Sequence, residues 1–177
     1  MTTVLQTAQD LLPTKVRETI LLRAYAALKI PMIGYTRPVV EALDAEHCVV
    51  RIPLCRRTKN HVRSMYFGAL AVGADVTGGM MAMYWTRQRK SGVVGVFKDL
   101  HADFLARPDG DVVFTCDEGR VIGELVDRAV ASGERVELPI HVSARALAKG
   151  EQREVARFTM MLSIKNSTGK RREATQG

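Results

Sequence analysis

The sequence predicts an α+β fold in which a curved antiparallel sheet of about five to six strands wraps around one long buried helix. Residues 66–86, YFGALAVGADVTGGMMAMYWT, contain a single charge, Asp75, and would be apolar on every side of a helix. Such a helix is typically buried on all sides. The segments around it have strand patterns joined by short turns, and an apolar helix needs a sheet that curls over it.

The first half of the chain predicts a helix, a strand pair and the central helix. Residues 14–30 place apolar side chains at helical spacing, so we expect an additional N-terminal helix that Pro31 ends. Residues 39–43 and 47–54 are expected to form two strands joined by a short turn. A polar, basic loop follows them, and the central helix over 66–86 comes next.

The second half predicts four strands and one further helix. Residues 92–107 alternate in places and are interpreted as one long strand, with 111–118 as its neighbour. Residues 121–133 form an amphipathic pattern that ends at a glycine, as a helix does. Residues 134–148 and 153–165 are expected to be two long strands. No repeat or linker interrupts the sequence, so 1–177 is interpreted as a single domain.

Composition narrows the possible classes of function. The net charge of +7 and the pI of about 9.6 suit an anionic partner. Residues 166–177 are interpreted as a flexible basic tail. Because no nucleic-acid motif accompanies the charge and aromatic residues are only 6%, we expect no nucleic-acid partner.

Further features concern compartment, metals and membranes. The N-terminus lacks the pattern of a signal peptide, and three cysteines without CxxC spacing suggest reduced thiols, so we expect a cytoplasmic protein. The four histidines have no ligand spacing, so no metal site is expected. The length of 66–86 invites a transmembrane interpretation, but four glycines and a central aspartate argue against membrane insertion.

A resemblance to a known family becomes specific at residues 60–79, NHVRSMYFGALAVGADVTGG. Hotdog-fold acyl-CoA thioesterases of the PaaI type carry an asparagine, a His-Gly-Gly turn six residues later, and an acidic residue nine positions after the histidine. Here Asn60 lies six residues before Tyr66, Gly68 occupies the second glycine position, and Asp75 lies nine residues after Tyr66. Tyr66 and Phe67 replace the His-Gly of that pattern.

The chain resembles still more closely an uncharacterised branch of the hotdog superfamily, a domain of unknown function, over roughly residues 14–166. The segments that carry this resemblance, besides the block above, are IPMIGYTRP (30–38), VFKDLHADFLAR (96–107), FTCDEG (114–119) and VARFTMMLSIK (155–165). The resemblance implies a hotdog fold, thioester hydrolysis without a cofactor, and a site at the interface of a homodimer, which could assemble further into a tetramer.

The resemblance and the residues together indicate which residues would be catalytic. Asp75 would be the base or the nucleophile, because thioester hydrolysis needs a carboxylate to activate water or attack the carbonyl carbon. The backbone N–H groups of Phe67 and Gly68 would polarise the carbonyl at a helix N-terminus. Asn60 would orient the water or the carbonyl. The alternatives are a structural buried acid for Asp75 and a loop-capping role for Asn60.

A second set would contact the substrate. Arg56, Arg57 and Lys59 could meet the phosphates of coenzyme A, or could form a solvated loop. His61 could carry a proton, or could be a half-exposed loop residue. Tyr66 could donate a hydrogen bond into the pocket, or could pack on the sheet.

The sequence therefore predicts an acyl-CoA thioesterase, with a non-catalytic acyl-CoA-binding or sensing protein as the alternative. Phe67 lies eight residues before Asp75, or about 12 Å along one helix, so one thioester cannot easily contact both in a single chain. A second chain packed antiparallel could supply the other half of the site. A hydratase would need a histidine near Asp75, and a nucleic-acid-binding module would leave the spacing from Asn60 to Asp75 unexplained.

Overall fold

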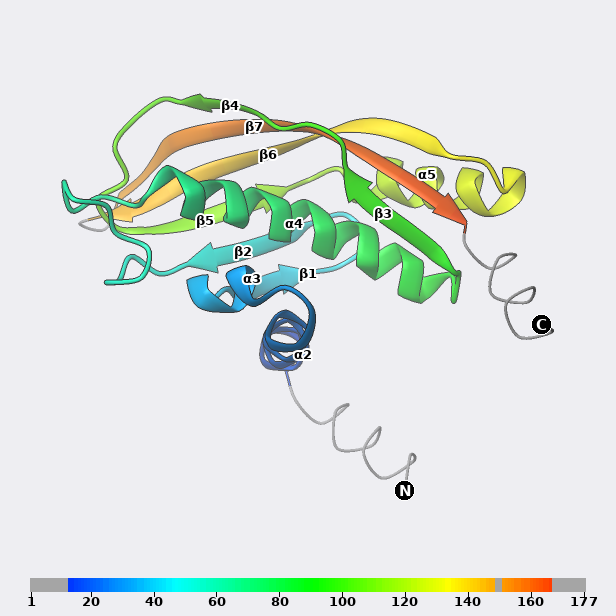
Figure 1. Ribbon diagram of the computed structural model, residues 1–177, viewed down its shortest axis with the longest axis horizontal. Helices are drawn as coiled ribbons and strands as arrows, with labels where there is room; N and C mark the ends of the chain where they lie inside the picture. Colours follow the sequence, from blue (N-terminus) through cyan, green and yellow to red (C-terminus); the bar gives the residue numbers. More distant parts are fainter. Residues whose placement is uncertain (1–12, 149–150, 167–177) are drawn as a thin grey trace, which may run out of the picture.

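The computed structural model describes residues 13–148 and 151–166, and it has the expected α+β architecture. Its sheet has the strand order β1-β2-β5-β6-β7-β3, with β4 also paired to β7, and every pairing is antiparallel. The sheet curves around the long helix α4 (Figure 1). The predicted tail over 166–177 lies almost entirely outside the described residues.

Helix α4 spans Phe67–Gln88 and packs against β2, β5 and β6. Glycine lets the sheet approach it closely. A Cβ atom at Gly73 would lie 2.3 Å from the ring of Phe114, and one at Gly78 would lie 2.6 Å from Cδ1 of Ile140. These contacts explain much of the glycine content of the helix, because any larger residue would push the strands away.

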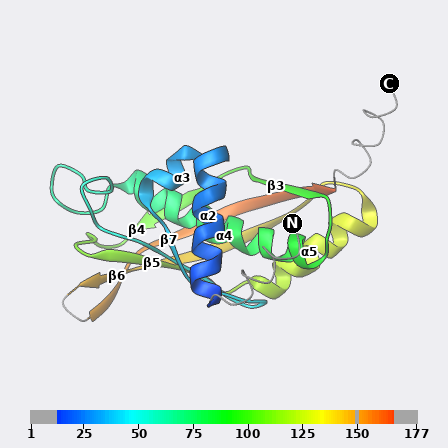
Figure 2. The same cartoon turned by 90° about the horizontal axis from the view of Figure 1, so that it is seen from below.

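In the part of the chain that the structure describes, two helices precede the sheet. Helix α2 spans Thr14–Lys29, and a short helix α3 over Pro31–Thr36 follows it at once. The sequence correctly places the end of α2 before Pro31, but it does not predict α3, because proline that stops one helix is also favourable as the first residue of the next. Seen from below, α2 runs across the direction of α4 (Figure 2).

The two edges of the sheet differ. Strand β1 (Val39–Leu43) pairs with β2 (Cys48–Ile52), and α2 covers its other side. The hydroxyl of Thr19 on α2 accepts a hydrogen bond of 2.9 Å from the N–H of Val40. At the opposite edge, β3 (Val93–Phe97) pairs with β7 on one side, and no described residue pairs with its other side.

The single strand expected over 92–107 is wrong: the structure has β3 and a separate strand β4 (His101–Phe104), both paired with β7. Phe97 lies opposite Leu162 and His101 lies opposite Thr159. The chain therefore advances four residues from β3 to β4 while β7 advances only three. One extra residue makes a β-bulge, which is common at sheet edges. The side chain of Asp99 accepts a hydrogen bond of 2.8 Å from the backbone of β7 there.

The remaining elements complete the sheet. Strand β5 spans Asp111–Cys116, helix α5 spans Gly119–Ser132, and the long strands β6 and β7 span Val136–Ala148 and Glu151–Asn166. Helix α5 ends at Gly133, whose φ of 69° is the left-handed value that favours glycine at a helix C-terminus.

Candidate active site

Asp75 lies on α4 and is half-buried. Within residues 13–148 and 151–166 it has neither a hydrogen-bond partner nor an ion-pair partner. Burial therefore raises the pKa of its carboxyl group above the ordinary value for aspartate, with no neighbouring charge to oppose the shift. A carboxylate with a raised pKa is a stronger base than usual, which suits proton transfer from water.

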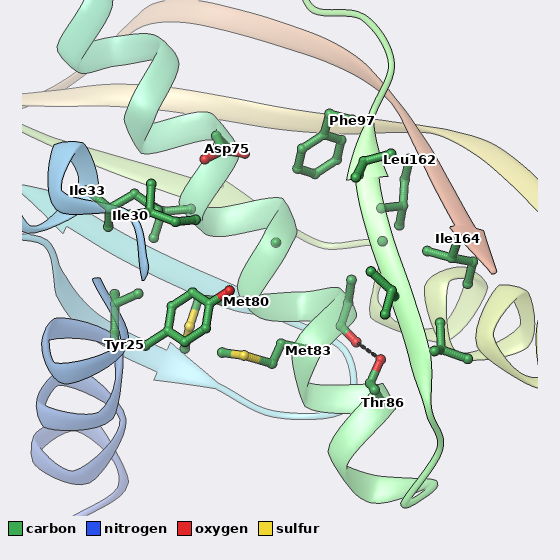
Figure 3. Close-up of a pocket in the computed structure, with 18 residues that line it drawn as sticks. Tyr25, Ile30, Ile33, Asp75, Met80, Met83, Thr86, Phe97, Leu162 and Ile164 are labelled. Carbon is green, nitrogen blue, oxygen red and sulfur yellow. Dashed lines mark hydrogen bonds between the residues drawn. The ribbon is translucent and has the colours of Figure 1, made fainter. Parts of the chain in front are cut away.

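A cavity of about 570 Å³ opens beside Asp75. Figure 3 shows the carboxyl group at one end of this space, between α3 and Phe97 of β3. The lining is otherwise dominated by apolar side chains from α2, α3, α4, β3 and β7. Ligand pockets have typical volumes of about 300–1,000 Å³ and apolar walls with a few polar groups, so the space is large enough for an organic molecule.

The start of α4 carries N–H groups that are free within the described part of the chain. The carbonyl oxygen of Tyr66 accepts hydrogen bonds from the N–H groups of Ala69 (2.9 Å) and Leu70 (3.2 Å). The N–H groups of Phe67 and Gly68 have no such acceptor, and no side chain caps the helix. Two free donors at a helix N-terminus favour a partial negative charge, such as the oxygen of a polarised carbonyl.

The Tyr66 side chain lies next to the start of α4. Its ring lies against Gly68, where an added Cβ atom would be only 2.5 Å from Cε1 of Tyr66. It also contacts the ring of Phe67, with 4.7 Å between the centroids. Both aromatic side chains are exposed, at 49% and 59%. A ligand that reaches the helix start would therefore meet an aromatic surface first.

Asn60 braces the loop that leads into α4. Its Oδ1 atom accepts hydrogen bonds of 3.1 Å from the N–H groups of Val62 and Ser64, and its Nδ2 donates to the Ser64 hydroxyl at 3.1 Å. The N–H of Tyr66 donates to the carbonyl of Thr58 at 2.8 Å, which ties the loop to the helix. This geometry matches the loop-capping alternative, and an added role in orienting water stays a prediction.

The basic residues of the same loop lie on the surface. Arg56, Arg57, Lys59 and His61 are all exposed. The guanidinium group of Arg57 lies 5.3 Å from the centre of the Tyr35 ring, a cation–π distance that links the loop to α3. The charges are therefore available to an anionic group that approaches the start of α4.

Within one chain the two halves of the predicted site stay apart. Asp75 lies eight residues along α4 from Phe67, which corresponds to about 12 Å. The structure thus brings Tyr66, Phe67 and Gly68 together with the basic loop, and it places Asp75 separately, beside the cavity.

Sequence reasoning missed much of the cavity lining. The lining includes Tyr25 of α2, Ile33 of α3 and Ile30 between the two helices, and no local pattern places these helices against α4. Gly79 carries a signal that could have been used, because it lies four residues after Asp75 and therefore on the same helix face.

Comparison with known proteins identifies the family. A family model described as Domain of unknown function (DUF4442) matches residues 18–164. This chain belongs to that family. A search of curated proteins finds no match to the chain.

Solved structures define the fold of this DUF4442 domain. It is similar to a protein of unknown function from Chlorobaculum tepidum TLS, with a TM-score of 0.74 at 14% identity over 87% of this chain and 98% of the other. A probable thioesterase from Pseudomonas aeruginosa gives 0.67 at 22% identity over 88% and 97%. A thioesterase family protein from Silicibacter pomeroyi gives 0.62 at 15% identity over 82% and 96%. These similarities confirm the thioesterase-like hotdog fold.

Two further findings concern membranes and metals. Among the helices that the structure describes, none is long and apolar enough to cross a membrane. The described residues also contain no group of three or more histidine, cysteine, aspartate or glutamate side chains that could hold a metal ion.

Proposed function

We propose that this DUF4442 domain hydrolyses acyl-CoA thioesters at a site formed between two copies of the chain. The observation that carries the proposal is Asp75, a carboxylate with no partner among the described residues at the end of an apolar cavity. Leaving an acid unpaired in such a place costs stability, so it calls for a function. The thioesterase names of structural neighbours support the reaction class.

The free edge of the sheet supports pairing with a second copy. Val94 and Val96 on β3 are 58% and 53% exposed, although they lie on a strand with an apolar sequence. An unpaired apolar edge is a template for another strand. Antiparallel pairing of β3 with the β3 strand of a second copy would align the two α4 helices in opposite directions. The Asp75 of one chain would then approach the start of α4 in the other.

The chemistry then follows from groups on both chains. Asp75 removes a proton from water, and the resulting hydroxide attacks the thioester carbonyl carbon. The N–H groups of Phe67 and Gly68 donate to the oxygen as it gains negative charge. The C–S bond breaks, and the proton held by Asp75 passes to the departing thiolate, leaving a carboxylic acid and a free thiol. Arg56 and Lys59 would attract the phosphates of coenzyme A.

The deciding experiment measures thiol release from short, long and aromatic acyl-CoAs by wild type and Asp75→Asn. We expect cleavage by wild type and a loss of about 100-fold or more in the variant, the usual contribution of a general base. Circular dichroism and light scattering should show an unchanged fold and oligomeric state. Hydrolysis that persists in the variant would exclude Asp75 as the base.

A non-catalytic acyl-CoA-binding protein is the second candidate, because the Tyr66 ring lies against Gly68 and limits access to the helix start. Such a protein would be stabilised against heat by acyl-CoA without releasing thiol. Thiol release that depends on Asp75 would rule it out.

A further inference from the structure

The cavity beside Asp75 has one wall that neither the sheet nor α4 supplies. Leu22 and Tyr25 of α2 belong to the lining, followed by Ile30 and Ile33. Tyr25, Ile30 and Ile33 lie on the side opposite to β3 (Figure 3). These helices therefore enclose a space that would otherwise be an open groove between α4 and the edge of the sheet.

An ion pair between a buried glutamate and a partly exposed arginine links this wall to α4. Glu18 of α2 is only 4% exposed, and its Oε2 atom accepts a hydrogen bond of 2.9 Å from Nη2 of Arg87 near the end of α4. The short helix α3 also packs against both α2 and α4. A wall anchored to α4 at both ends keeps the width of the cavity constant.

Gly79 forms the floor of the cavity on α4. It shares a helix face with Asp75, Met83 and Thr86, and all four line the space. A Cβ atom at Gly79 would have no other atom within 4 Å, whereas one at Gly73 or Gly78 would collide with the core. Packing against the sheet therefore requires the other two glycines, but it does not require this one.

The lining beyond Asp75 is suited to an uncharged tail. Among the described residues no other charged side chain lines the cavity, and the hydroxyl of Thr86 already donates to the carbonyl of Ala82 at 2.9 Å. The two methionines of the lining, Met80 and Met83, have flexible side chains that adapt to an apolar ligand. A charged or strongly polar tail would lose its hydration there and would gain few partners, such as the hydroxyl of Tyr25.

The length of the space follows from the helix that lines it. From Asp75 to Thr86 the helix rises about 16 Å, at about 1.5 Å per residue. Three bonds of an extended backbone advance about 3.5 Å, so an extended alkyl chain advances about 1.2 Å per bond. Because the thioester carbonyl carbon would itself lie about 3 Å from the carboxyl group of Asp75, about 13 Å remain for the chain, which is about eleven bonds or twelve carbons.

We propose that Gly79 and the α2–α3 wall select thioesters with a straight, uncharged alkyl tail of about twelve carbons. This inference rests on the proposed function, because it places the thioester carbonyl at Asp75 and the tail along α4. Gly79 is a specificity-determining residue: its missing side chain leaves the volume that the tail occupies.

The experiment measures binding rather than turnover, using calorimetry with S-alkyl thioethers of coenzyme A, which cannot be hydrolysed. The tails are methyl, hexyl, dodecyl and hexadecyl. We expect the affinity of wild type to rise by about fourfold per methylene up to about twelve carbons, and then to level off. Equal affinity for the methyl and dodecyl compounds, or no binding of the dodecyl compound, would overturn the proposal.

Two variants of Gly79 provide the structural test. Gly79→Leu should lower the affinity for the dodecyl compound by about 30-fold or more and leave the methyl compound unchanged, because the added side chain fills the cavity. Gly79→Ala is the matched control and should stay within about threefold of wild type. Both replacements favour the helix, so both proteins should fold.

The outcomes separate this inference from the proposed function. Chain-length selection that Gly79→Leu abolishes, without any thiol release by wild type, would support the inference and reject hydrolysis. Thiol release without chain-length selection would support hydrolysis and reject the inference. Dissociation of the Gly79→Leu protein in light scattering would mean that a second copy fills the cavity, which would overturn the inference.

Discussion

Replacing Asp75 by asparagine should make the protein more stable at neutral pH. Burial raises the pKa of this carboxyl group and, among the described residues, no partner compensates for the lost hydration of the charge. Asparagine has nearly the same shape and carries no charge. The substitution thus removes the cost of burying an anion while keeping the packing of α4.

The magnitude follows from linkage between protonation and folding. Each tenfold decrease in the acid dissociation constant of Asp75 on folding lowers the free energy of unfolding at neutral pH by about 1.4 kcal/mol. Because the pKa of Asp75 is raised, the folded protein still holds the proton at pH values where the unfolded chain has released it. The wild-type protein therefore loses stability as pH rises from about 3.9, the pKa of an ordinary aspartate, to the raised pKa of the folded state.

The assay is urea and thermal unfolding of wild type and Asp75→Asn from about pH 3.5 to about pH 8. This range begins just below the pKa of an ordinary aspartate. The variant should match wild type at the acid end and become more stable above it, with a rise in melting temperature of about 2–4 °C per kcal/mol for a chain of this size. Asp127→Asn is the control. Two hydrogen bonds from Arg89, of 2.6 and 2.8 Å, lower the pKa of Asp127. Replacing Asp127 should therefore lower the stability at neutral pH, the opposite of the effect expected at Asp75.

A destabilised Asp75→Asn protein at pH 7 would refute this reasoning. It would mean that some group outside the described contacts stabilises the anion, and in a dimer the start of the second α4 helix would be the first to examine.

Three other changes test the framework of the site. Gly119→Ala should cost about 2–4 kcal/mol in urea unfolding, because its Cβ atom would lie 2.2 Å from the carbonyl oxygen of Ala45. Val96→Lys should produce a monomer in light scattering if β3 pairs with a second copy, whereas Val130→Lys on the exposed face of α5 should leave the assembly intact. Glu18→Gln should cost about 1 kcal/mol in the same unfolding assay, because it removes the anion of a salt bridge whose other member, Arg87, is 40% exposed and can be hydrated instead.

The fold was predictable because its main signals are local. A helix without a polar face must be surrounded, and the strand patterns around it supply the sheet. The bulge between β3 and β4 could not be predicted in the same way. It depends on register against β7, where Phe97 and His101 face Leu162 and Thr159, and register is a property of two strands rather than of one.

The candidate site was predictable only in part. Asp75 stands out in the sequence as one charge in an apolar run, and the structure leaves it without a partner among the described residues. Asn60 stands out by its spacing, but its side chain braces the loop, which spacing cannot reveal. The wall formed by α2 and α3 depends on how two helices cross α4, and the sequence contains no local signal for that crossing.

Two unfavourable features, an unpaired carboxylate and an uncovered strand, border the same cavity, and together they support a function for it. An unpaired carboxylate on α4 lowers stability, and an uncovered apolar strand at β3 invites unwanted pairing. Each has an ordinary explanation when taken alone. Asp75, however, lies at one end of a space that β3 lines on one side, while α2, which also covers the other edge of the sheet, closes the opposite side. A domain that covers one sheet edge and leaves the other open beside a half-buried acid without a partner among the described residues supports the proposal that a second copy completes the site.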